Sequence, residues 1–142
     1  MKKSVLLLCI AVLLTSSCSP SKNSLAQAMR ILNSKWVLQS LAGQSSLGNI
    51  FENKLPFLQF DTDALSVSGN NGCNNMTGPL KMEAGNKISF SQLAGTKMAC
   101  PGQGEPLFMD ALTKVTHFKI DNEVLTLLNQ GQEVMRFLKD NS

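Results

Sequence analysis

Short stretches in which apolar and polar residues alternate recur along this chain, separated by turns that contain glycine, asparagine or aspartate. The clearest are 65–69 and 87–91, and such alternation is typical of half-buried β-strands. The segment 78–83 leads into a hairpin turn signal at 84–86. Further strands are predicted at 35–41, 56–61, 116–120, 124–128 and 133–138.

One segment has the periodicity of an amphipathic helix. It begins near Glu105 and Pro106, and proline is favoured at the first helical position because its missing N–H would be unpaired there anyway. The apolar residues of this segment fall on one stripe: Leu107, Phe108, Ala111, Leu112 and Val115. The pattern therefore predicts an α+β protein that is mainly β, with an antiparallel sheet curled around, or capped by, one α-helix.

The N-terminus has the features of a bacterial lipoprotein signal peptide. Two lysines precede an apolar run at 5–14, which as a helix would span roughly 15 Å, about half of a bilayer core. Small residues then lead to Cys18, as in a lipobox, so we expect cleavage before Cys18 and lipidation of its thiol. Thr15 stands where a lipobox prefers leucine, and ordinary cleavage near Ser17 with an unmodified thiol is the alternative.

These features predict a signal peptide at 1–17, a tether at 18–30 with a short helical turn starting near its end, and one folded domain at 31–140. Lipidation would anchor the protein in the bacterial cell envelope. Because Ser19 rather than aspartate follows the lipid acceptor, the sorting rule of enterobacteria-like species predicts the outer membrane.

The charge balance argues against nucleic acid as a partner. Without Lys2 and Lys3, 11 of the 13 basic residues remain against 10 acidic ones. The chain therefore lacks the excess of positive charge that binding to nucleic-acid phosphates requires. Seven Phe, one Trp and no Tyr also leave few side chains on which bases could stack. The remaining length suits one core rather than two domains.

Two short motifs, each centred on a cysteine, stand out from this pattern. The first, at 68–78, contains Cys73 and three glycines, Gly69, Gly72 and Gly78, a composition that suits a demanding turn. The second, at 95–101, contains Thr96, Met98 and Cys100. In an exported protein these two cysteines are candidates for a disulfide, and two buried free thiols are the alternative.

Four asparagines surround the first cysteine: Asn70, Asn71, Asn74 and Asn75. Asparagine tolerates left-handed backbone and caps its own turn, which favours a structural corner. The functional alternative is an amide-lined spot that hydrogen-bonds a sugar or a peptide group.

Catalytic and metal chemistry find little support. The two motif cysteines are 27 positions apart, unlike the close pair of thiol oxidoreductases. Two cysteines and His117 in the folded part fall short of the four ligands that zinc requires. Asp61 and Asp63 could pair as carboxylates for acid–base work. They lie in a predicted turn, however, where exposure to solvent is the ordinary explanation for two charged residues. We therefore expect no catalytic residue, no metal site and no cofactor.

The two motifs resemble those of the META (HslJ-like) domain family. The resemblance rests on the Gly-Cys-Asn turn at 72–74, the Thr-Lys-Met-Ala-Cys segment at 96–100, the helix after it and the opening Trp36. It implies a compact β-rich fold with one helix across an incomplete barrel. The motif residues that it marks are Gly69, Gly72, Asn74, Gly78, Thr96 and Met98.

The family has no established enzymatic activity and therefore no catalytic residues to carry over. It is associated with the bacterial envelope and with stress responses. We therefore expect a non-enzymatic envelope lipoprotein that binds or stabilises another envelope component, and it would contact the membrane through its lipid. The alternative is a small carrier that holds an apolar ligand in the mouth of the barrel.

Overall fold

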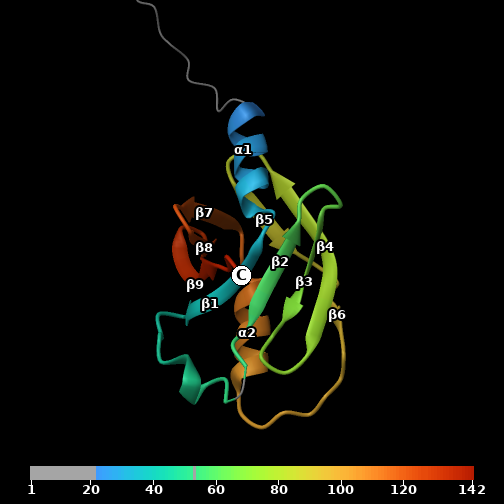
Figure 1. Cartoon of the computed structure of the whole chain (residues 1–142), viewed down its shortest axis with the longest axis vertical. Helices are drawn as coiled ribbons and strands as arrows, with labels where there is room; N and C mark the ends of the chain where they lie inside the picture. The colour runs from blue at the N-terminus through green and yellow to red at the C-terminus, as the bar shows by residue number, and fades with distance from the viewer. Residues whose placement is uncertain (1–21, 53) are drawn as a thin grey trace, which may run out of the picture.

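The computed structural model describes residues 22–52 and 54–142. These residues form two α-helices, one 3₁₀ helix and nine strands (Figure 1). In chain order the elements are α1 (Lys22–Leu32), β1 (Lys35–Leu41), η1 (Leu47–Asn49), β2 (Phe57–Asp61), β3 (Ser66–Asn70), β4 (Asn75–Glu83), β5 (Lys87–Phe90), β6 (Ala94–Gly95), α2 (Gly104–Thr113), β7 (His117–Asp121), β8 (Val124–Asn129) and β9 (Gln132–Lys139).

The strands form an antiparallel barrel that closes on itself. Their order is β3-β2-β1-β9-β8-β7-β5-β4-β6, and β3 also pairs with β4. The β3–β4 register runs from Ser66↔Pro79 to Asn70↔Asn75, so it joins the two ends of an eight-stranded ring. The α+β, mainly β class is thus confirmed, but the incomplete barrel with one helix is corrected to a closed barrel with two helices.

The physical reason for the closure lies in the length of β4. The sequence pattern predicts an extended segment only from Gly78, whereas β4 begins at Asn75 and runs for nine residues. Its first half completes the pairing with β3, and its second half pairs with β5. The seam between β5 and β7 is much shorter, with a register of one pair, Lys87↔His117.

Packed side chains fill the interior of the barrel. Trp36 is fully buried, and its indole Nε1–H donates to the carbonyl oxygen of Leu32 over 2.9 Å. Phe108 of α2 meets Phe137 of β9 edge to face, with ring centroids 6.4 Å apart. Other side chains at or near zero exposure come from several strands and α2: Leu38, Leu58, Phe60, Ile88, Leu112, Leu125, Leu127 and Met135.

The N-terminal segment differs from the predicted tether. Helix α1 already begins at Lys22, and Leu32 at its end is fully buried in the core. The hydroxyl of Thr62 donates to the carbonyl oxygen of Met29 over 3.3 Å, which holds the helix against the β2–β3 turn. The predicted signal peptide at 1–17 and Cys18 lie outside the described residues.

Helix α1 and the second cysteine motif lie at opposite ends of the molecule (Figure 1). Strands β2 and β3 run between these ends, so the turn after β3 and the segment after β6 share the end far from α1. No helix in 22–52 or 54–142 has both the length and the apolar character needed to cross a bilayer.

Candidate functional site

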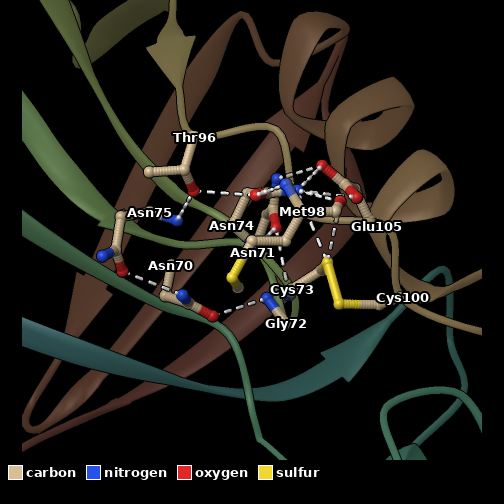
Figure 2. The surroundings of a disulfide bond; sticks show 10 residues. All are labelled: Asn70, Asn71, Gly72, Cys73, Asn74, Asn75, Thr96, Met98, Cys100 and Glu105. Carbon is tan, nitrogen blue, oxygen red and sulfur yellow. Dashed lines mark hydrogen bonds between the residues drawn. A yellow bond between two sulfur atoms is a disulfide. The ribbon is translucent and has the colours of Figure 1, made fainter.

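The two cysteine motifs meet at a disulfide between Cys73 and Cys100 (Figure 2). The two Cα atoms are 5.9 Å apart. Cys73 belongs to the turn between β3 and β4, and Cys100 to the segment between β6 and α2. The predicted pairing is confirmed, and the bond fastens an exposed segment to the rim of the barrel.

The turn before β4 is held by the asparagine side chains within it. Asn71 Oδ1 accepts hydrogen bonds from the backbone N–H groups of Cys73 at 3.1 Å and Asn74 at 2.7 Å. Asn70 Oδ1 accepts one from the N–H of Gly72 at 2.9 Å. Gly72 has a φ of +98°, a conformation that favours glycine. A Cβ there would also lie 2.4 Å from the ring of Phe51.

Asn74 is the central residue of the site. Its Oδ1 accepts from the Met98 N–H and from the Thr96 hydroxyl, each at 2.7 Å. Its Nδ2 donates to the Met98 carbonyl oxygen at 3.1 Å. The buried amide therefore pairs with both backbone groups of Met98, as a neighbouring strand would (Figure 2). This pairing fixes the position of the second motif against the first.

Glu105 completes the site, and sequence reasoning missed it. Its Oε1 accepts hydrogen bonds from Nδ2 of Asn71 at 2.9 Å and from Nδ2 of Asn74 at 3.0 Å. The residue lies in the first turn of α2, where the helix dipole favours a negative charge. Among the ion pairs of the described residues none involves Glu105. The feature of the sequence that could have indicated this role is an acidic residue in the first turn of the predicted helix.

These contacts favour the structural interpretation of the asparagines. Asn70, Asn71 and Asn74 are buried, and their amides bond to other groups of the same site. Asn70 Nδ2, for example, donates to Asn75 Oδ1 at 3.0 Å. The site is therefore a cross-linked corner that joins a turn, a loop segment and a helix.

The motif glycines permit close packing around this corner. A Cβ on Gly69 would lie 2.1 Å from the backbone oxygen of Phe57, and a Cβ on Gly78 would lie 3.1 Å from the Cα of Leu93. Thr96, through its N–H, donates to the Asn75 carbonyl oxygen at 3.0 Å. Thus the structure places most of the predicted motif residues at one end of the barrel, whereas Gly78 lies further along β4, where it pairs with Val67 of β3.

A cleft of about 270 Å³ opens beside the disulfide. Its walls include Phe51, Cys73, Cys100, Pro101, Glu105 and Pro106. The neighbouring segment 96–103 is exposed along its whole length, and the side chain of Met98 is 59% exposed although its backbone is held by Asn74. The corner thus presents a fixed backbone with outward-facing side chains.

The other candidate chemical residues have local structural contacts. Asp61 Oδ1 accepts from the backbone N–H groups of Asp63 and Ala64, at 3.1 and 2.8 Å. His117 Nδ1 lies 2.9 Å from the hydroxyl of Thr116. Within 22–52 and 54–142, no group of three His, Cys, Asp or Glu side chains lies close enough to hold a metal ion.

The chain belongs to the META domain family, whose model matches residues 27–142. The comparison with curated proteins gave no match. Among solved structures, an NMR structure of a protein from Burkholderia xenovorans is 22% identical with a TM-score of 0.60, and each chain is covered in full.

Two further structures share the fold. One, an NMR structure, is 20% identical with a TM-score of 0.57, over 77% of this chain and 92% of the other. The second is a crystal structure of a DUF4847 family protein from Bacteroides vulgatus, 14% identical with a TM-score of 0.52, over 79% and 96% of the two chains. At these identities the likeness concerns the fold alone.

Loss of the disulfide should destabilise the domain without abolishing its fold. The cysteines are 27 positions apart, and the chain-entropy model assigns roughly 3.5 kcal/mol to closing such a loop. We expect the double variant Cys73→Ala/Cys100→Ala to lose about this free energy of unfolding in urea titrations. The wild-type domain, reduced with excess dithiothreitol, is the matched control and should lose a similar amount. A loss of less than about 1 kcal/mol in the free energy of unfolding would contradict a stabilising role of the disulfide.

Proposed function

We propose that this protein is a non-enzymatic lipoprotein of the bacterial cell envelope that binds or stabilises another envelope component, in connection with envelope stress. The anchor would be a lipid on Cys18, for which the sequence pattern at 5–18 is the support. The binding surface would be the corner formed by the two cysteine motifs. The link to stress rests on the family resemblance.

The observation that carries this proposal is the position of the corner relative to α1. The chain enters the domain through α1, and the disulfide-linked corner lies at the opposite end (Figure 1). A lipid on Cys18 would therefore place α1 towards the bilayer and the segment 96–103 away from it. A rigid exposed segment facing away from the membrane suits recognition of another protein.

We do not extend the proposal to the apolar carrier. A carrier needs apolar space for its ligand, whereas the barrel holds packed side chains such as Trp36, Phe108 and Phe137 at zero exposure. Helix α2 contributes Phe108 and Leu112 to this filling. The cleft beside the disulfide lies outside that core and has charged residues in its wall.

Site-specific photo-crosslinking in intact envelopes would test the proposal. A photoreactive amino acid at position 98 should give one reproducible protein adduct, because the Met98 side chain is exposed at the proposed surface. The same amino acid at position 65 is the matched control, since Leu65 is 46% exposed in the β2–β3 turn near α1. It should give no such adduct.

The variant Cys18→Ser tests the anchor in the same experiment. Without the lipid acceptor, the protein should leave the membrane fraction, and the adduct at position 98 should weaken. Adducts of equal yield at positions 98 and 65 would contradict the proposed surface. Membrane retention of Cys18→Ser would contradict the proposed anchor.

A further inference from the structure

We propose that the Cys73–Cys100 disulfide is a site of thiol–disulfide exchange at which a low-molecular-weight thiol attacks Sγ of Cys100 and forms a mixed disulfide there. The inference does not rest on the proposed binding function. It follows from the unequal surroundings of the two sulfur-bearing residues and from the cleft that leads to them.

The first observation is the difference in exposure. Cys73 is 7% exposed, buried within the asparagine turn, whereas Cys100 is an exposed residue of the segment before α2. Both residues line the cleft of about 270 Å³. This volume admits a small thiol, and access is one of the factors that decide which sulfur of a disulfide is attacked.

The second observation concerns the sulfur that would leave. Sγ of Cys73 lies 3.4 Å from the Nδ2 donor of Asn74 and 3.5 Å from the carbonyl oxygen of Met98. The two hydrogens of Asn74 Nδ2 already serve Met98 and Glu105, but the Met98 carbonyl can accept the S–H once the Cys73 thiol is protonated. Of the two disulfide sulfurs, only that of Cys73 has such polar contacts among the described residues (Figure 2).

These contacts favour one direction of exchange. A thiolate R–S⁻ forms a bond to Sγ of Cys100, the Cys73–Cys100 bond breaks, and its electron pair passes to Sγ of Cys73. The Cys73 thiolate then takes a proton from water. Protonation removes a negative charge close to the Glu105 carboxylate, which Asn74 Nδ2 also contacts, and gives an S–H that the Met98 carbonyl oxygen can accept. The products are R–S–S–Cys100 and a Cys73 thiol.

The corner should survive this exchange. The hydrogen bonds that Asn71 Oδ1 accepts from the backbone N–H groups of Cys73 and Asn74 do not involve sulfur. The same is true of the pairing between Asn74 and the backbone of Met98. The segment 96–103 therefore keeps its register on the turn, while its covalent link is replaced by an adduct that faces the cleft.

The test uses the oxidised full domain and reduced glutathione as the probe. After brief incubation, acid quenching and alkylation, peptide mass spectrometry locates glutathione and the alkyl label. We expect glutathione on Cys100 and alkyl label on Cys73, with about a tenfold preference over the reverse product, because Cys100 is the more accessible residue and the Cys73 thiol has an acceptor in the Met98 carbonyl. The same incubation in concentrated urea is the matched control, and there the preference should vanish.

Two results would overturn the inference. One is a mixed disulfide mainly on Cys73 in the folded protein. The other is the absence of any adduct until urea is added, which would show that the folded domain shields both sulfurs. Far-UV circular dichroism of the singly modified protein completes the test: a retained β-sheet spectrum supports the surviving corner, and loss of that spectrum contradicts it.

Discussion

Asn74→Asp is expected to lower the free energy of unfolding by about 3–5 kcal/mol at neutral pH, because it places an unpaired charge inside the corner. Asn74 is 3% exposed, and its Nδ2 donates to the Met98 carbonyl oxygen and to Glu105. An aspartate of the same shape accepts but does not donate. Two carboxylates would then face each other, and the Met98 carbonyl would lose its partner.

Urea denaturation measures the effect, with Asn75→Asp as the matched control. Asn75 is exposed and uses its Oδ1 to accept from Asn70, a role that an aspartate preserves, so this variant should change stability by less than about 0.5 kcal/mol. The deficit of Asn74→Asp should shrink as the pH is lowered, because protonation of the new carboxyl restores a donor. Equal effects of the two variants would contradict the central role of Asn74.

Gly69→Ala is expected to cost about 3 kcal/mol or more, through a steric clash within the sheet. The added Cβ would lie 2.1 Å from the backbone oxygen of Phe57. Because that oxygen belongs to β2, which is paired on both sides with β1 and β3, the clash cannot be relieved by rotating a side chain. Relief requires the strands to separate next to the Cys73 turn.

Thermal and urea unfolding of Gly69→Ala and Gly48→Ala would test this explanation. At Gly48 a Cβ meets nothing within 4 Å, and no positive φ opposes the substitution. That variant should be neutral, or gain about 0.4–1 kcal/mol from the reduced entropy of its unfolded chain. A mild effect of Gly69→Ala, similar to that of Gly48→Ala, would show that β2 and β3 have more freedom than their pairing suggests.

Local sequence patterns predicted most of the strands and the second helix. Alternation placed the strands at 87–91 and 124–128 within a residue or so of β5 and β8, because a half-buried strand exposes every second side chain to water. The apolar stripe located α2, but the helix starts at Gly104, so Pro106 is its third residue and not the first as predicted. Each of these signals acts over a few neighbouring residues.

The same patterns predicted only a short helical turn where the structure has the second half of α1, and they did not predict β6. The polar composition before Ala26 suggested a tether, but α1 is anchored by a distant contact between Thr62 and Met29. Strand β6 is two residues long and pairs with Met76 and Thr77 of β4, so it has no periodicity of its own. Both elements depend on partners far away in the chain, which a local pattern does not contain.

The sequence by itself determined the mainly β class, the turn chemistry of the glycines and asparagines, and the pairing of Cys73 with Cys100 as a candidate. These properties follow from the backbone preferences of single residues and from short-range periodicity. Only the tertiary structure decided that the barrel closes, since closure depends on the register of β3 against β4. It also decided what the asparagines do: Asn74 can pair with Met98 and Glu105 only because folding brings residues 24 and 31 positions apart into contact.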